Sequence, residues 1–567
     1  MNRPKNNALM LGALAVVMFG LVYGFVSLTR DQGVTGEPRS TRAPYSMENS
    51  RVKLNDLYDR LHVATLTPKK DGSYIEGESA AVLPDISEYP FVVNPATADF
   101  LTVYASLEKA GDGYVSWLAD MAAKFNDSGV EVDGKPVSVG IRSIPSGLGA
   151  AFIASGKYKP DIFVPSNELW GDMLVGKGVK VRLIEKRLAG NVAGIVLFNK
   201  KNDELIQKHD VLNAKIIADS VLAGELFLGY ADPLYTSEGL NFIMAMLYAF
   251  DADNPLSEAS VSQLRQFQDH IPYVSSEATQ LKGSALSGTL DGFVSDYQTY
   301  VNSPELQQSY LFTPIGVRHD QPVYEIGELS ELKKQIAMEF VHFSKTQESQ
   351  KAAADKGFNG LDDYAHGFAN QDGATVLQAQ ETWKKEKNGT RDLTAVFVAD
   401  VSGSMDGSPL LKLKASLNRS AALIDLNTNI GLVTFSDEVS VALPIAKFDS
   451  DQKAYFSNAV RSMTAGGGTA MFDAVVVAQK MLIDAQSRNP NTKLMLFVLT
   501  DGESNRGYEF EDIENIVQGL RIPVYTIGYN ANIDVLQSLS DINEATTMNA
   551  DTDDVIYKLQ SLFNAQM

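Results

Sequence analysis

The sequence predicts a protein of the α/β class whose folded part follows an N-terminal transmembrane helix. From about residue 99 onward, apolar segments of strand length alternate with segments of helical periodicity, a pattern that builds parallel sheets. Residues 395–399 form an apolar run that ends abruptly at Asp400, which is typical of a buried parallel strand with a site at its carboxyl end. The length of 567 residues suggests roughly three to four domains.

Composition excludes several classes of function. The net charge of −21 argues against a nucleic-acid partner, which would need a basic face. The chain has no cysteine, so it forms no disulfide, thiol nucleophile or zinc–thiolate site. The motifs G-x-S-x-G, H-E-x-x-H and G-x-x-x-x-G-K-[ST] do not occur in it. We therefore expect a binding protein and not an enzyme.

Residues 1–30 are expected to form a cytoplasmic stub and a membrane anchor. Residues 8–28 carry no charge and follow Arg3 and Lys5. As a helix they would span about 30 Å, the thickness of a bilayer core. Positive charge before the span keeps the N-terminus in the cytoplasm and places the bulk of the chain outside the cell membrane, as a single-pass protein. A cleaved signal peptide is the alternative, although its apolar core is usually only about 7–15 residues long.

Residues 31–98 are expected to be a stalk and linker, because their first part is polar, rich in Gly, Pro, Ser and Thr, and without apolar periodicity. Residues 99–357 carry the regular alternation of strands and helices and form the next domain. A second linker at residues 358–390 contains the charge run at 384–387. The last domain then covers residues 391–567.

The domain at 99–357 resembles the bacterial extracytoplasmic solute-binding proteins of the two-lobed class, near the molybdate- and sulfate-binding type. The resemblance rests on the order of loosely matching pieces: Ser106 after the first strand, the S-G-x-L stretch at Ser146, the segments 159–167 and 194–198, the loop 231–239, and the segments 292–297 and 337–343. It implies a cleft between two lobes that binds a small molecule, lined by Ser106, Ser146, Asn167, Tyr235, Ser237 and Tyr297.

Serines at helix N-termini bind oxyanions because free backbone N–H groups and the helix dipole supply the positive end. The same serines also make ordinary N-caps, and that interpretation stays open for Ser146 and Ser237. Glu238 stands beside the proposed anion loop, where a negative charge is unfavourable. This neighbour speaks against a free inorganic oxyanion and leaves room for a sugar, a peptide or another neutral ligand.

In the last domain, small oxygen-bearing side chains follow strand ends. Asp400, Ser402 and Ser404 form the pattern D-x-S-x-S, Thr469 follows three glycines, and Asp501 follows the apolar run 494–500. Parallel strands would bring all five to one edge of the sheet. Oxygen-only donors suit a hard cation such as Mg²⁺, and Mn²⁺ or Ca²⁺ would also accept them. The alternative is that the aspartates are helix N-caps and the serines turn residues.

This joint pattern resembles the von Willebrand factor A family and its metal-ion-dependent adhesion site. The resemblance implies a Rossmann-like domain with a mostly parallel central sheet. It also implies that Ser402, Ser404 and Thr469 approach the metal directly, that Asp400 and Asp501 act directly or through water, and that a partner supplies an acidic group.

We therefore expect a membrane-anchored, extracytoplasmic protein with two recognition modules. Its A domain would bind a protein or polymer through a metal ion, and its two-lobed domain would bind or sense a small molecule. Two alternatives remain: a tethered solute-binding component of an ABC importer, and an adhesion or assembly scaffold whose cleft binds nothing.

Overall fold

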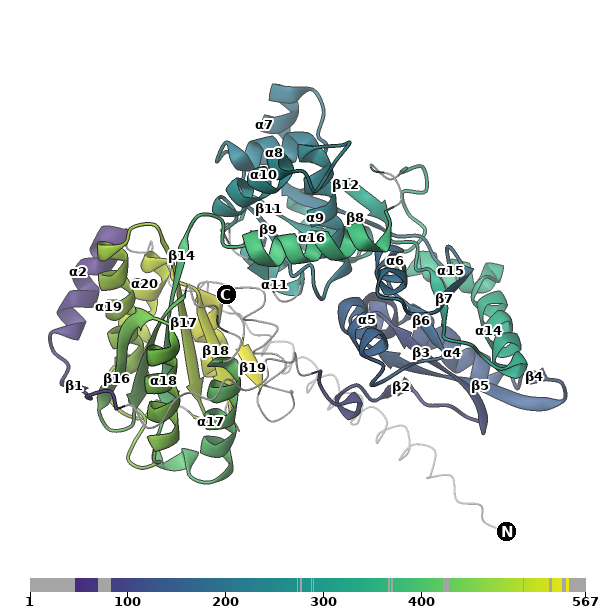
Figure 1. The fold of residues 1–567 in the computed structure, drawn as a ribbon. Coiled ribbons are helices and arrows are strands. Elements are labelled where there is room, and N and C mark those ends of the chain that lie inside the picture. The colour runs from purple at the N-terminus through teal and green to yellow at the C-terminus, as the bar shows by residue number, and fades with distance from the viewer. Residues whose placement is uncertain are drawn as a thin grey trace, which may run out of the picture.

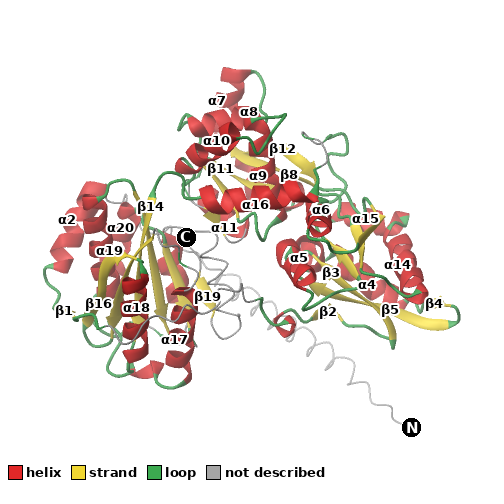
Figure 2. Cartoon of the chain, viewed as in Figure 1, coloured by secondary structure: helices red, strands yellow, loops and turns green. Residues whose placement is uncertain are grey.

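The computed structural model describes three α/β bodies, each with its own sheet (Figures 1 and 2). Two of them are the lobes of one domain and the third is the C-terminal domain. The described residues are 46–69 and 83–549, except 273, 276–277, 287, 289, 366–367, 369–370, 422–423, 425–427, 503, 530–532 and 543–546.

Lobe 1 contains a mixed sheet in the order β2-β5-β3-β6-β13-β7, with β4 paired to β5. The central pairs β3–β5 and β3–β6 are parallel, which confirms the predicted α/β character. Its strands are β2 (Phe91–Val93), β3 (Asp99–Ala105), β4 (Glu131–Val132), β5 (Lys135–Ser143), β6 (Ile162–Val164), β7 (Val181–Glu185) and β13 (Val323–Ile326). Its helices are η1 (Ile86–Glu88), α3 (Leu107–Ala110), η2 (Gly113–Val115), α4 (Trp117–Asp127), α5 (Ser146–Ser155), α6 (Leu169–Gly176), α14 (Glu331–Ser344) and α15 (Gln347–Asp355).

Lobe 2 contains a sheet in the order β10-β9-β11-β8-β12. The chain enters it between β7 and β8 and returns to lobe 1 between β12 and β13, so two connections join the lobes. Its strands are β8 (Val192–Phe198), β9 (Leu228–Ala231), β10 (Val274–Ser275), β11 (Gly292–Asp296) and β12 (Tyr310–Arg318). Its helices are α7 (Asn199–His209), α8 (Ala214–Leu222), α9 (Ser237–Phe250), α10 (Glu258–Asp269), α11 (Ala278–Leu286), α12 (Tyr297–Val301) and α13 (Pro304–Ser309).

The segment expected to be a second linker instead contains α16 (Gly373–Glu386), which packs against both lobes. It contacts α6 of lobe 1 and α9 and α10 of lobe 2 (Figure 1). At one end the backbones nearly touch, since a Cβ atom on Gly373 would lie 1.9 Å from the carbonyl oxygen of Asp172. At the other end Trp383 is fully buried, and its indole Nε1 donates to the Tyr230 hydroxyl at 2.7 Å. One continuous apolar core therefore runs through both lobes and α16.

The C-terminal domain has a seven-stranded sheet in the order β1-β16-β15-β14-β17-β18-β19. All neighbouring strands are parallel except β15 and β16, as predicted. The strands are β1 (Val63–Thr65), β14 (Asp392–Asp400), β15 (Thr428–Phe435), β16 (Val439–Lys447), β17 (Thr492–Thr500), β18 (Val524–Gly528) and β19 (Thr547–Asn549). The helices are α2 (Met47–Tyr58), η3 (Gly403–Met405), α17 (Ser408–Ala421), α18 (Ser450–Ser462), α19 (Met471–Arg488), α20 (Phe510–Leu520) and α21 (Ile533–Ile542).

Apolar cores lie on both faces of this sheet, and Figure 2 shows helices on each side of it. The first strand and first helix of the domain come from the segment expected to be a stalk. Leu54 of α2 is fully buried in one of the two cores, and Val63 of β1 pairs in parallel with Val439 of β16. The two-lobed domain is thus inserted into the sequence of the C-terminal domain, between β1 and β14. β1 is too short to show an apolar pattern from which this pairing could be predicted.

The predicted membrane anchor at residues 8–28 lies outside the described residues. Among the helices that the structure does describe, none has the length and apolar character needed to cross a bilayer.

Candidate functional site

Two neighbouring parallel strands bring the two predicted carboxylates to one sheet edge. β14 and β17 pair in register, with Ala399 opposite Leu499, so Asp400 ends the first strand where Asp501 follows the second. Asp400 is fully buried and held at both oxygens. The backbone N–H of Ser402 donates to its Oδ1 at 2.7 Å, and the Thr500 hydroxyl donates to its Oδ2. The orientation of this carboxylate is therefore fixed by the chain.

The two serines of the D-x-S-x-S pattern lie in the turn that follows β14. The hydroxyl oxygens of Ser402 and Ser404 are 3.0 Å apart, and the Ser404 hydroxyl donates to Oδ1 of Asp501 at 2.8 Å. These contacts join residues from two strand ends into one continuous polar group. The structure thus brings Asp400, Ser402, Ser404 and Asp501 together, as the sequence predicts.

The loop that carries Thr469 lies against the same turn. The N–H of Gly403 donates to the carbonyl of Gly467 at 3.0 Å, and the N–H of Gly466 donates to the carbonyl of Val401 at 2.8 Å. Gly467 has a φ of +86°, a conformation that favours glycine, and a Cβ atom there would lie 2.5 Å from a carboxylate oxygen of Asp437. The loop therefore delivers Thr469, which is buried, to the edge where Asp400 ends its strand.

The chemistry of this donor set fits a hard divalent cation. Octahedral Mg²⁺ with bonds of about 2.1 Å places neighbouring ligand oxygens about 3 Å apart. The oxygen–oxygen distances of 3.0 Å from Ser402 to Ser404 and 2.8 Å from Ser404 to Asp501 match that spacing. Burial raises the pKa of both Asp400 and Asp501, and the charge of Asp501 adds slightly to the shift of Asp400.

Within the part of the chain that the structure describes, no group of three or more His, Cys, Asp or Glu side chains is placed to hold a metal. The edge described above has only two carboxylates, and its remaining oxygens are hydroxyls. The metal site therefore stays a prediction.

The two lobes of the inserted domain touch directly at the predicted cleft. Trp170 of lobe 1 donates from Nε1 to the hydroxyl of Ser237 in lobe 2 at 2.8 Å. The N–H of Gly147 donates to the carbonyl of Tyr235 at 3.0 Å, and a Cβ atom on Gly147 would lie 2.1 Å from the carbonyl oxygen of Leu234. Only glycine fits this approach, so the cleft is closed at this point.

The predicted serines of lobe 1 bond to groups of the chain itself. The hydroxyl of Ser106 donates to Oε1 of Glu108 at 2.7 Å, and Nζ of Lys109 lies 2.9 Å from the same oxygen. Ser166 donates from its hydroxyl to Ser106 at 3.2 Å and from its N–H to the hydroxyl of Ser146 at 3.3 Å. Glu108, Lys109 and Ser166 are thus part of the cleft, although they were not among the predicted cleft residues.

Two further predicted cleft residues have different surroundings. Asn167 is fully buried, and its Nδ2 lies 3.4 Å from the carbonyl of Ser237 and 3.1 Å from Nε2 of His319. It therefore lies between the lobes, as expected. The ring of Tyr297 packs edge-on against Phe312, with ring centroids 5.3 Å apart, so it belongs to an aromatic group of lobe 2.

Acidic side chains dominate the lobe 2 side of the cleft. Glu238, beside Ser237, has its pKa raised by burial and by the charges of Asp296 and Glu108. Burial and Glu108 also raise the pKa of Asp296. Burial lowers the pKa of Lys109, and the charges of Glu108 and Glu238 act against that shift. The fold therefore buries three acidic side chains, Glu108, Glu238 and Asp296, close enough together to affect one another's protonation.

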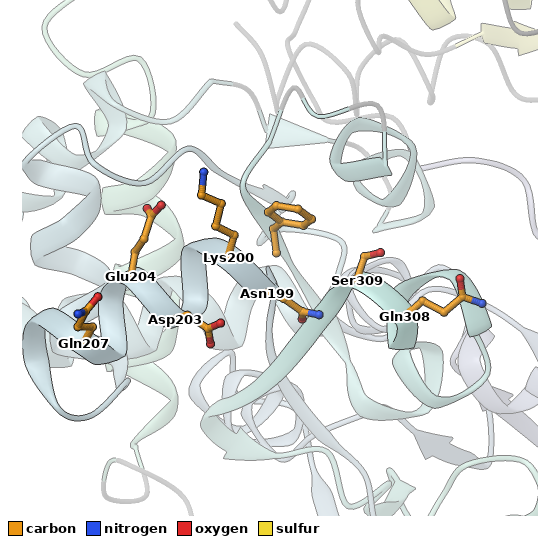
Figure 3. Close-up of a pocket in the computed structure, with 8 residues that line it drawn as sticks. Asn199, Lys200, Asp203, Glu204, Gln207, Gln308 and Ser309 are labelled. Atoms are coloured by element: carbon orange, nitrogen blue, oxygen red, sulfur yellow. The ribbon is translucent and has the colours of Figure 1, made fainter.

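A surface hollow of about 500 Å³ lies on lobe 2, away from these residues. In Figure 3 the labelled side chains come from α7 and from α13 and do not converge on one point. They are Phe198, Asn199, Lys200, Asp203, Glu204, Gln207, Gln308 and Ser309. No predicted site residue is among them.

Comparison with known families confirms the two predicted domains, without testing the metal site. The model of the von Willebrand factor type A domain matches residues 395–565, and the model of a bacterial extracellular solute-binding protein matches residues 109–359. The chain therefore combines an A domain with a solute-binding domain, and both domains belong to classes of binding proteins.

Individual proteins resemble only parts of the chain. A von Willebrand factor A domain-containing protein of Dictyostelium discoideum is 28% identical over 176 residues, which cover 30% of this chain but 18% of that protein. The solved sulfate-binding protein SubI of Mycobacterium tuberculosis covers 47% of this chain and 88% of its own, with 18% identity and a TM-score of 0.34. A periplasmic thiamin binding protein covers 52% and 99%, with 13% identity and a TM-score of 0.38. These low scores say nothing about a ligand.

Proposed function

We propose that this protein is a membrane-anchored, extracytoplasmic binding protein whose A domain holds Mg²⁺ and uses it to bind an acidic group of a protein or polymer partner. The observation that carries the proposal is the group formed by Asp400, Ser402, Ser404 and Asp501, against which the Thr469 loop packs. The role is one of adhesion or assembly and involves no catalysis. Mn²⁺ or Ca²⁺ would suit the same oxygens.

Each part of this edge has a definite task. Asp400, Ser402, Ser404, Thr469 and Asp501 would hold the cation. When bound, it would supply an electrophilic position for a carboxylate of the partner. The Ser402 N–H and the Thr500 hydroxyl keep the Asp400 carboxylate in place before any cation arrives. Only two of the five donors are charged, so their charge balances that of a divalent cation. The loaded site would then carry no excess negative charge to repel the acidic group of the partner.

The metal is tested by thermal unfolding of the full chain with MgCl₂ or with a chelator. A cation at a hundred times its dissociation constant stabilises the fold by about 2.7 kcal/mol, or roughly 5–10 °C in a domain of this size. We expect that rise in the wild type and none in Asp400→Ala. Glu438→Gln, which changes an exposed carboxylate in the neighbouring β15–β16 turn, is the matched control and should respond like the wild type. No response of the wild type to Mg²⁺, Mn²⁺ or Ca²⁺ would overturn the proposal.

Membrane anchoring is tested separately, by fractionation of cells that produce the chain with and without residues 1–30. We expect the complete chain in the membrane fraction and the shortened chain outside it. An N-terminus beginning after residue 28 in the mature protein would instead identify a cleaved signal peptide.

A second candidate function is a tethered solute-binding component of an importer, which the solute-binding family match favours. It predicts a small molecule bound reversibly between the lobes. Native mass spectrometry of the chain, before and after denaturation, distinguishes the two: a defined low-mass passenger favours transport or sensing, whereas a bound divalent ion alone favours the adhesion role.

A further inference from the structure

The anion-binding groups of lobe 1 surround a carboxylate of the same chain. Oε1 of Glu108 accepts a hydrogen bond from the Ser106 hydroxyl at 2.7 Å and lies 2.9 Å from Nζ of Lys109. Ser166 supports this arrangement through its hydrogen bond to Ser106, and Lys109 also donates to Oε1 of Gln321 at 2.5 Å, in the connection between the lobes. A hydroxyl, a second hydroxyl behind it and a buried ammonium are the groups that would bind a small oxyanion.

This ion pair is enclosed by the protein. The Lys109 side chain is 0% exposed and the Glu108 side chain 13% exposed. Although burial raises it, the pKa of the Glu108 carboxyl falls to about 2 because of Lys109 and the hydroxyls of Ser106 and Ser166. Burial in turn lowers the pKa of Lys109, and the charge of Glu108 acts against that shift. Removal of Glu108 would therefore leave the buried Lys109 side chain without its carboxylate partner, which is strongly unfavourable for an ammonium.

The two lobes also contact each other directly beside this pair. Trp170 bonds Ser237, the Gly147 N–H bonds the Tyr235 carbonyl, and α16 packs across both lobes. The charge of Glu238, which begins the lobe 2 helix α9 beside Ser237, also acts on Lys109. An added anion would have to displace the Glu108 carboxylate from Ser106 and Lys109.

We propose that the two-lobed domain carries its own ligand: the Glu108 carboxylate fills the oxyanion position formed by Ser106, Ser166 and Lys109 and holds the cleft closed without a solute. The wild-type domain then binds no small carboxylate, sulfate or molybdate, and it serves as a closed body that carries the A domain. This goes beyond the function proposed for the A domain, since the metal site is independent of it.

Chemical rescue tests the proposal on the full chain. Glu108→Ala removes the carboxylate and leaves an oxyanion site, so formate at about 100 mM should raise its unfolding temperature by several degrees relative to NaCl of equal ionic strength. Formate should leave the wild type unchanged, and also the control Glu204→Ala, which removes a carboxylate from the surface helix α7. Adding Lys109→Met to Glu108→Ala should abolish the rescue.

Two outcomes would overturn the proposal. One is binding of formate, sulfate or molybdate by the wild type with a dissociation constant below about 1 mM in calorimetry. The other is a Glu108→Ala protein that responds to none of these anions. If this variant does not fold in their absence, refolding in formate decides: recovery of folded protein supports the proposal and lack of recovery contradicts it. None of these readouts involves Mg²⁺, so failure here leaves the metal site untouched.

Discussion

Trp383 offers a direct measure of how firmly α16 joins the two lobes. Its side chain is fully buried, and its indole Nε1 donates to the Tyr230 hydroxyl at 2.7 Å. The same hydroxyl also donates to Oε1 of Gln268 at 2.9 Å. Trp383→Ala therefore removes both an apolar anchor and one of two partners of a buried hydroxyl.

The expected cost follows from these contacts. Truncation of a buried tryptophan destabilises a protein by about 3–5 kcal/mol, through the lost burial and the remaining cavity. Loss of a hydrogen bond to a buried hydroxyl adds about 1 kcal/mol. Trp383→Phe keeps most of the packing and removes the hydrogen bond, so it should cost only about 1–2 kcal/mol.

Urea unfolding of the full chain, followed by a probe in the two-lobed domain, measures these differences. Lys385→Ala is the matched control, because it changes an exposed residue of the same helix and should cost less than about 0.5 kcal/mol. A Trp383→Ala variant within 1 kcal/mol of the wild type would refute the reasoning, since α16 would then act as a linker with no part in the core. In that case a two-lobed domain ending at residue 357 would be stable without α16. We expect instead that a fragment ending at residue 357 is unstable.

Two further predictions concern other buried groups. Leu54→Ala in α2 should lower the free energy of unfolding of the A domain by about 2–4 kcal/mol, whereas Val52→Ala, at a 62% exposed position, should change it little. Equal, small effects of both variants in denaturant unfolding would show that α2 is part of a stalk. Glu238 has its pKa raised from 4.5 to about 8, so the folded state binds its proton more tightly, and stability present at acid pH is lost as the pH rises through that window. Glu238→Gln should remove most of this decline, and parallel melting profiles of the two proteins from pH 5 to 8.5 would contradict it.

Local patterns were enough to predict the edge that carries Asp400 and Asp501. Each follows an apolar run long enough to identify a buried strand, and parallel pairing then brings the strand ends together without further information. Ser146 and Ser237 do begin helices, but the N-caps are Pro145 and Thr236, so the interpretation of these serines as N-caps is wrong. Where short-range sequence decides the structure, the prediction is confirmed.

Other features depend on contacts between distant segments. Strand β1 is three residues long and pairs with residues 439–441, so its periodicity is too short to identify it or its partner. Val376, Ala379 and Trp383 form the apolar face of α16. The charge run at 384–387, at the end of this helix, is typical of a linker and led to the wrong prediction. Glu108 looked like an ordinary acidic residue in a first helical turn, and only the fold shows it buried against Lys109.

Because the two-lobed domain is inserted between β1 and β14, the first elements of the A domain are synthesised long before the rest of that domain. Roughly 370 residues separate β1 from its partner strand β16, and ribosomes add roughly 5–20 residues per second, so β1 is made about 20–75 s before the strand with which it pairs. During that interval Leu54 has no core to enter. A chaperone or the export machinery would have to shield it, and late-folding fragments lacking the first 65 residues would expose the edge of β16 to other chains.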